Sequence, residues 1–149
     1  MERHSSGIKI FAIALVIYGV ITLLGLGSYS DFKLLCKGFP QAVIFIIYIF
    51  AVGYGILGIL CGSRILRMEE WARKTAVMLV LMSLLLGLLM NPVMFRNLEG
   101  FYAEKGQAAA GLDLIIKSYI LSTIIFTLFE LSFVYYFTRT RIKELFRID

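Results

Sequence analysis

The sequence predicts an all-α integral membrane protein with four transmembrane helices in an antiparallel bundle. Of its 149 residues, 60% are hydrophobic and only 17% are charged, and the mean hydropathy is +0.86. A soluble domain has about half apolar residues and about a quarter charged ones. The apolar residues also form four blocks of about 20 residues, a length that crosses a bilayer core of about 30 Å. We therefore expect one four-helix domain over residues 1–149.

The first two spans are predicted at residues 8–27 and 41–62, after a polar tail of residues 1–7. The apolar part of the first span is longer than the roughly 7–15 residues of a secretory signal peptide. A glycine-leucine-glycine sequence at residues 25–27 resembles a cleavage site, so removal of this segment stays open. Turn-forming residues and Pro40 separate the two spans.

Glycines recur along the second span. The sequence from Gly53 through Gly55 to Gly58 has the spacing GxGxxG, but a dinucleotide site needs this spacing between a strand and a helix, so we reject that interpretation. Ala51, Gly55, Gly58 and Gly62 instead fall on one stripe of a helix. Small residues in such a stripe let a second helix approach closely in lipid. The partner is either another span of this chain or a second protomer.

A short basic hinge connects the second and third spans. Glu69 precedes Arg73 by four residues, and Glu70 precedes Lys74 by four, which is the favourable order for ion pairs on a surface helix. Trp71 is typical of a membrane-interface anchor. We expect contacts with lipid or with the membrane interface at Arg64, Arg67, Trp71, Arg73, Lys74, Arg139, Arg141 and Lys143.

The third span is predicted at residues 75–94, ending near Asn91-Pro92 because proline cannot continue the helical hydrogen-bond ladder. A long loop follows, although residues 104–116 could instead extend the last helix outward. The fourth span is predicted at residues 117–138, and a basic tail follows at residues 139–149.

Charge distribution predicts the orientation. Of the 15 Lys and Arg residues, ten lie in the N-terminal region, the hinge and the C-terminal tail, which leaves five in the other two loops. The positive-inside rule therefore places both termini in the cytoplasm. The net charge of +5 gathers at the ends of the apolar blocks, which indicates contact with anionic lipid rather than with nucleic acid.

The sequence offers no motif for a metal or a cofactor. Cys36 and Cys61 are predicted at opposite membrane surfaces, too far apart for a disulfide within one subunit. His4 lies alone in the N-terminal tail, and there is no CxxC motif or Cys/His cluster. We therefore expect neither metal nor cofactor.

Glu130 is the one acidic or basic residue well inside an apolar block. It lies about 3 Å below the predicted midplane near Leu128. A charged carboxylate at that depth costs at least ~2.5–3.5 kcal/mol, and no Lys or Arg lies at the same depth. We therefore expect a protonated, hydrogen-bonded carboxyl group that faces the bundle interior. The candidate polar partners are Tyr18, Tyr54, Ser83, Tyr119, Thr123 and Thr127.

Two segments resemble small uncharacterised prokaryotic four-helix membrane proteins. One runs from Gly62-Ser-Arg64 to Trp71-Ala-Arg73, and is similar to a "GR…WAR" hinge. The other is the end of the chain from Val134 to Phe146, where Thr140 stands in place of an expected proline. The resemblance covers about a third of the chain. It implies the four-span architecture in a prokaryotic inner membrane and carries no activity, so no functional residue is transferred.

Two functions from different classes remain. The first is a non-enzymatic interaction, assembly or accessory subunit that acts through helix packing and binds other membrane subunits or itself. The second is a small proton- or ion-coupled transporter that uses Glu130. A membrane enzyme is disfavoured because the sequence has no nucleophile, acid/base pair or metal ligands at motif spacing.

Overall fold

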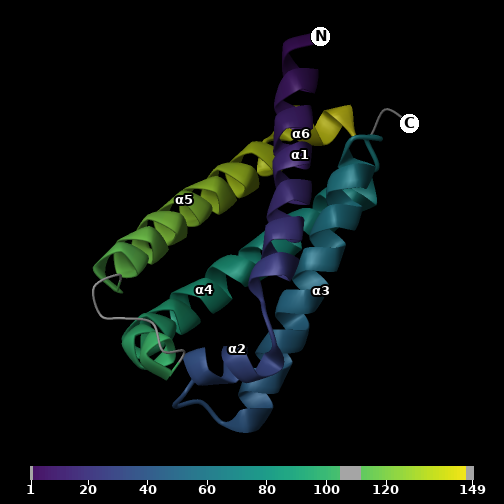
Figure 1. Cartoon of the computed structure of the whole chain (residues 1–149). Helices are drawn as coiled ribbons and strands as arrows, with labels where there is room; N and C mark the ends of the chain where they lie inside the picture. The colour runs from purple at the N-terminus through teal and green to yellow at the C-terminus, as the bar shows by residue number, and fades with distance from the viewer. Residues whose placement is uncertain (1, 105–111, 147–149) are drawn as a thin grey trace.

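The computed structural model describes residues 2–104 and 112–146, which form an all-helical fold (Figure 1). The helices in this part of the chain are α1 (Glu2–Gly25), α2 (Tyr29–Leu35), α3 (Gln41–Ile65), α4 (Glu70–Glu104), α5 (Leu112–Thr138) and α6 (Thr140–Leu145). By length and hydropathy, α1, α3, α4 and α5 could each cross a membrane. The prediction of an all-α protein with four such helices is confirmed.

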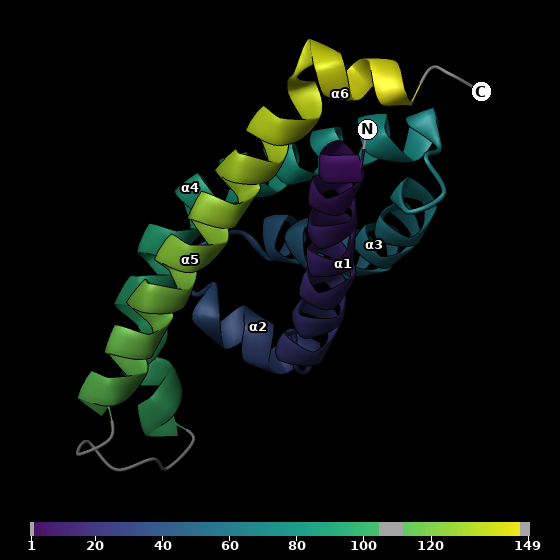
Figure 2. The same ribbon diagram turned by 90° about the horizontal axis from the view of Figure 1, so that it is seen from above.

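The four long helices form two pairs (Figures 1 and 2). α1 and α3 lie side by side along most of their length, and α4 and α5 form a second pair that is inclined to the first. α2 lies across one end of the bundle. α6 lies across the other end, close to the start of α1. The short helices therefore cover opposite ends of the long ones.

The predicted end of the third span at Asn91-Pro92 is wrong. α4 continues through Pro92 to Glu104, so its last turns replace the start of the predicted loop. Tertiary contacts stabilise this extension: Leu98 is buried, and the Asn97 side-chain amide donates to the carbonyl oxygens of Leu35 at 2.9 Å and Lys37 at 2.8 Å. A proline within a long apolar helix is tolerated where neighbouring groups satisfy the freed backbone.

The last long helix begins earlier than the predicted residue 117. α5 starts at Leu112, so the prediction that the last helix extends outward is confirmed for residues 112–116. Residues 105–111 lie outside the described part of the chain.

The glycine stripe of α3 packs against α1 of the same chain. A Cβ atom on Gly62 would lie 2.7 Å from the Ala12 carbonyl oxygen, and one on Gly55 would lie 3.1 Å from the Gly19 carbonyl oxygen. Gly58 faces the Cα atom of Gly19 at 3.7 Å from such a Cβ position. Real Cβ atoms do not fit at the shorter of these distances, so the glycines allow the two backbones to touch.

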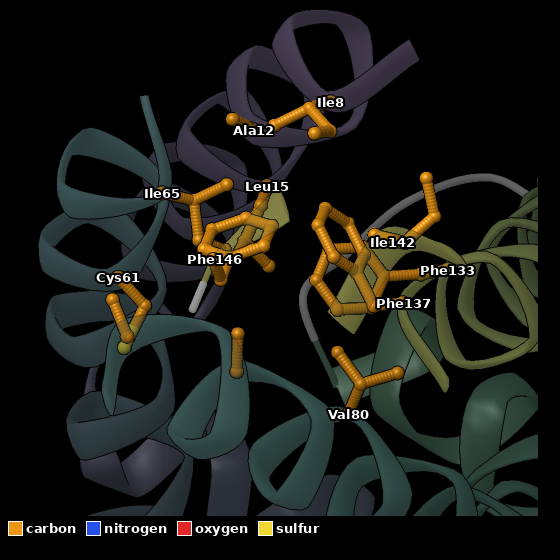
Figure 3. Packing of buried hydrophobic residues seen from close by; sticks show 12 residues of the cluster. Ile8, Ala12, Leu15, Cys61, Ile65, Val80, Phe133, Phe137, Ile142 and Phe146 are labelled. Atoms are coloured by element: carbon orange, nitrogen blue, oxygen red, sulfur yellow. The ribbon is translucent and has the colours of Figure 1, made fainter. Parts of the chain in front are cut away.

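Aromatic side chains fill the core at the α6 end of the bundle (Figure 3). Phe133 and Phe137 of α5 are fully buried, with ring centroids 4.5 Å apart. Phe11 of α1 meets both rings edge-on at 6.0 Å, while Ile142 and Phe146 close the cluster from α6 and the residue after it. A second cluster at the α2 end contains Phe32, Cys36, Ile44 and Met90.

The α1–α3 contact generates a stability prediction. We expect Gly62→Ala to lower the free energy of unfolding by about 1–3 kcal/mol, because the added methyl group overpacks a backbone contact. Gly53→Ala is the matched control, since a Cβ at Gly53 meets nothing within 4 Å, and helix propensity then favours alanine by up to about 1 kcal/mol. Unfolding in mixed detergent micelles, followed by circular dichroism, measures both variants. Equal stability of the two would contradict the α1–α3 packing.

Candidate functional site

Glu130 lies inside the bundle and is hydrogen-bonded to another helix. Its side chain on α5 is 5% exposed. The Tyr18 hydroxyl of α1 donates to its Oε1 atom at 3.3 Å. The Tyr18 ring is held between aromatic neighbours, with the Phe126 ring centroid at 4.8 Å and the Phe129 centroid at 6.0 Å. The carboxyl group and its donor are therefore both fixed by packing.

Ser83 and Tyr54 complete this polar cluster. The Ser83 hydroxyl of α4 lies beside the Glu130 carboxyl group and beside both tyrosine hydroxyls. The Tyr54 ring of α3 meets the Tyr18 ring edge-on, with centroids 5.6 Å apart. Each of the four long helices thus contributes one polar side chain. We call Tyr18, Tyr54, Ser83 and Glu130 the Glu130 cluster.

The Tyr54 hydroxyl is the unsatisfied member of the Glu130 cluster. Tyr54 is 4% exposed, and its hydroxyl lies beside Ser83 but makes no hydrogen bond within the described part of the chain. A buried hydroxyl without a partner costs about 1–3 kcal/mol relative to a bonded one. This atom therefore marks the place in the cluster where one further hydrogen bond could form.

The predicted polar stripe along α5 divides into two parts. The Tyr119 hydroxyl donates to Asn91 Oδ1 of α4 at 3.0 Å, with Thr123 beside it. Thr127 is half-buried between this contact and Glu130. The structure therefore brings Tyr18, Tyr54 and Ser83 to Glu130, but it places Tyr119 and Thr123 in a separate contact. The sequence did not predict Asn91 as a partner, because the adjacent Pro92 indicates the end of a helix there.

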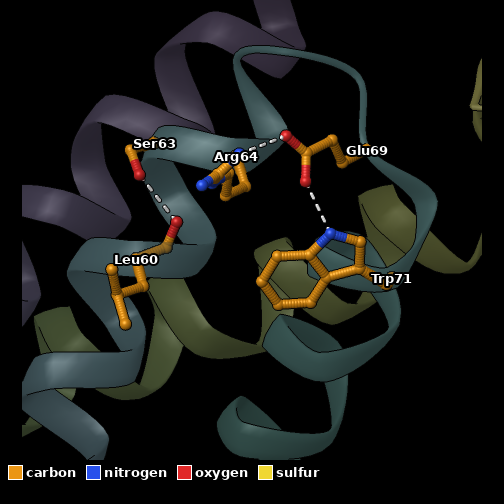
Figure 4. Close-up of polar contacts among 5 residues, drawn as sticks. All are labelled: Leu60, Ser63, Arg64, Glu69 and Trp71. Carbon is orange, nitrogen blue, oxygen red and sulfur yellow. Dashed lines mark hydrogen bonds and ion pairs between the residues drawn. The ribbon is translucent and has the colours of Figure 1, made fainter.

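Glu69 organises the hinge between α3 and α4 (Figure 4). It accepts hydrogen bonds from Arg64 Nη1 at 2.9 Å and from Trp71 Nε1 at 2.5 Å. The hydrogen bond from Arg64, with a smaller effect of Trp71, lowers the pKa of Glu69. Glu69 precedes the first residue of α4 and follows Met68, which has a φ of 63°, so its side chain turns back toward α3. The predicted Glu69–Arg73 pair is therefore wrong, whereas Glu70 and Lys74 pair at 3.0 Å.

Arg73 differs from the other basic residues of the predicted interface set. Its side chain is buried, with 5% exposure of the residue, so it does not face lipid as expected. Its Nη1 atom donates to the Phe137 carbonyl oxygen at 3.0 Å, its Nη2 atom lies 3.6 Å from Glu70, and its guanidinium group lies over the Phe146 ring. It thereby satisfies a carbonyl at the end of α5, which a helix leaves without an intrahelical partner.

The remaining members of the predicted interface set lie at the same end of the bundle. Arg139 donates to the Tyr135 hydroxyl and stacks 4.4 Å from the centroid of its ring, and Lys143 is half-buried. The exposed members are Arg64, Arg67, Trp71, Lys74, Arg139 and Arg141.

The cysteines do not form a pair. Cys36 and Cys61 are buried free thiols, and burial raises the pKa of the Cys36 thiol to about 11. The part of the chain that the structure describes contains no group of three or more His, Cys, Asp or Glu residues that could hold a metal ion. The His4 side chain lies outside that part.

The sequence matches no protein-family model, and no curated protein or solved structure shows significant similarity to it. The resemblance of its hinge and its C-terminal segment to small prokaryotic membrane proteins therefore stays an expectation. The Glu130 carboxyl group bonds to Tyr18 of α1 and lies beside Ser83 of α4, and a carboxyl group in this position can also hold a proton.

We expect removal of the hydroxyl to have different effects on stability at the two tyrosines of the Glu130 cluster. We expect Tyr18→Phe to lower the free energy of unfolding by about 0.6–1.7 kcal/mol, the range of interhelical hydrogen bonds in membrane proteins. Tyr54→Phe is the matched control, and we expect it to leave stability unchanged or raised because the lost hydroxyl has no partner. Chemical unfolding in micelles measures both. A loss in Tyr54→Phe as large as in Tyr18→Phe would show that the Tyr54 hydroxyl is bonded.

Proposed function

We propose that this chain is a multi-pass protein of a prokaryotic inner membrane, with its four long helices crossing the bilayer as an antiparallel bundle. Large apolar side chains on the outside of the bundle support this placement: Leu24 is 80% exposed, Leu88 72% and Leu114 73%. Such surfaces are stable in hydrocarbon and prone to aggregation in water. The ionisable Glu130 is turned inward instead, as membrane burial requires.

The basic residues support an orientation with both termini in the cytoplasm. The hinge and the α5–α6 region, which hold Arg64, Arg67, Lys74, Arg139 and Arg141, lie at the end of the bundle where α1 begins (Figure 1). An excess of Lys and Arg is typical of the cytoplasmic side, where anionic lipids attract them.

Within the membrane, we propose a non-enzymatic role as an interaction, assembly or accessory subunit. The observation that carries this proposal is the Glu130 cluster, which takes one polar side chain from each long helix. Interhelical hydrogen bonds of this kind stabilise helix association in lipid. They suit a rigid bundle that presents its outer faces to other helices.

The outer face of α5 is the proposed surface for a partner helix. The glycine stripe of α3 is occupied by α1, so it is not available to another chain. Only 6% of the most apolar window of α5 is buried, against 22% for α1 and for α3. The α5 helix therefore has the most surface left for a second membrane subunit or a second copy of this chain.

A bulky substitution on α5 tests the assembly role. Leu128 is 59% exposed near the middle of α5, and we expect Leu128→Trp to remove a larger complex extracted from native membranes in mild detergent. Ile17→Trp is the matched control, because Ile17 is 53% exposed near the middle of α1. Native mass spectrometry measures the complex. A single chain of 16.9 kDa as the largest species of the unsubstituted protein would contradict the proposal.

A second candidate function is a small proton- or ion-coupled transporter. The observation that favours it is the Tyr54 hydroxyl, which is buried in the Glu130 cluster beside Ser83 and makes no hydrogen bond among the described residues. Intramembrane carboxyl groups are typical of proton pathways. The spare hydroxyl gives a proton on Glu130 a second position to bond to.

Proton flux separates this candidate from the assembly role. In proteoliposomes that carry a pH gradient and an internal pH-sensitive dye, a transporter would dissipate the gradient, and we expect Glu130→Gln to slow this at least about tenfold because the replacement amide cannot release a proton. Tyr119→Phe is the control, since Tyr119 belongs to the separate contact with Asn91. Equal flux in Glu130→Gln and in the unsubstituted protein would exclude Glu130 as the proton site.

A further inference from the structure

Figure 1 shows α2 at the end of the bundle opposite α6. A groove lies beside this helix. It has a volume of about 490 Å³ and is bounded by α2, the loop after it and the start of α3. α2 has a buried and an exposed face: Phe32 belongs to the hydrophobic cluster at this end of the bundle, whereas Lys33 is exposed. The groove is therefore open at the surface of the protein, at the end of the bundle opposite the one that we propose to be cytoplasmic.

Two cationic side chains line the groove, and a third lies next to Gly38 at its edge. Lys33 and Lys37 line it, and both are exposed. The Nη2 atom of Arg96 lies 3.8 Å from a Cβ position built on Gly38, which also lines the groove. No carboxylate in the described ranges is paired with any of these three side chains. Lys33 and Lys37 are four residues apart, and like charges at that separation along a helix repel, so an anion near them would stabilise the arrangement.

Apolar side chains form the rest of the groove. Leu34, Phe39 and Ile44 line it, and Ile44 belongs to the buried cluster at this end of the bundle. The groove thus joins a cationic edge to a hydrocarbon surface. This combination matches an amphiphile with an anionic head and an apolar tail, because neither part alone would cover both surfaces.

The backbone around the groove is fixed by contacts with α4. Asn97 donates to the carbonyl oxygens of Leu35 and Lys37, one on each side of Cys36, the residue that follows α2. Gly38 adopts a φ of +110°, a conformation that glycine accepts without strain. The chain then returns to Phe39, whose amide donates to the Cys36 carbonyl oxygen at 3.2 Å. The groove is therefore formed before a ligand arrives, which lowers the cost of binding.

We propose that this groove binds one anionic phospholipid, with its phosphate between Lys33, Lys37 and Arg96 and an acyl chain against Leu34, Phe39 and Ile44. Charge complementarity selects the headgroup, since a zwitterionic lipid brings no net negative charge to the three cations. The inference rests on the proposed membrane placement, and it goes beyond the proposed assembly role because that role uses the outer face of α5.

Lipid titration of the full chain tests the site. Native mass spectrometry of the detergent-solubilised protein measures the binding of phosphatidylglycerol and of phosphatidylcholine with equal acyl chains. We expect the unsubstituted protein to bind one phosphatidylglycerol more tightly. Each basic residue near a membrane surface changes affinity for anionic lipid by about fivefold, so Lys33→Gln with Lys37→Gln should lower it by roughly tenfold or more. Lys33→Arg with Lys37→Arg should retain it.

The control is Lys117→Gln, because Lys117 is also exposed but is already paired with Asp113 at 2.6 Å. Unchanged binding in this variant supports the site, whereas a loss equal to that of the double variant shows unspecific attraction and overturns it. Displacement of the lipid by an equal concentration of inorganic phosphate would also overturn it, since the acyl chain would then contribute nothing. Flotation with vesicles tests the membrane placement separately. A chain that floats but shows no preference for phosphatidylglycerol refutes the lipid site alone.

Discussion

The burial of one carboxyl group constrains the arrangement of all four long helices. Glu130 is among the few buried polar residues in the described part of the chain, and an unpartnered polar group in hydrocarbon costs several kcal/mol. Its partners come from α1 and α4, with Tyr54 of α3 beside them. The two helix pairs must therefore meet at this depth, and any relative sliding of α5 would remove Glu130 from its donors.

α1 can serve both pairs because its two faces differ in size. Gly19 and Ala12 face α3 and allow backbone contact, whereas Phe11 and Tyr18 reach across to the aromatic side chains of α5. Small residues bring helices close together in lipid, and aromatic side chains fill a wider separation. The same helix is therefore close to α3 and farther from α5, which is consistent with the inclination between the two pairs (Figure 2).

Features set by composition and by depth could be predicted from the sequence. The four long helices follow from blocks of apolar residues, and Tyr18 and Ser83 were expected near Glu130 because they lie at the same depth. Features set by tertiary contacts could not. Pro92 is a helix breaker in isolation, yet α4 continues because Asn97 and Leu98 find partners on the other side of it. Arg73 lies in a basic segment that is typical of a membrane interface. Only the position of the end of α5 shows that its side chain is buried against Phe137.

The structural and the proton-binding interpretations of the Glu130 cluster use the same hydrogen bond from Tyr18. They differ in what they require of Tyr54. A structural contact between helices needs no further partner, and an unbonded buried hydroxyl only weakens it. A proton site needs a second group to bond to, because a carboxyl group that gains a proton becomes a donor as well as an acceptor. The Tyr54 hydroxyl, which makes no hydrogen bond among the described residues, is an oxygen that can receive that bond through Ser83, which lies beside both Glu130 and Tyr54. The chemistry of the cluster therefore depends more on Tyr54 than on the bond that is already formed.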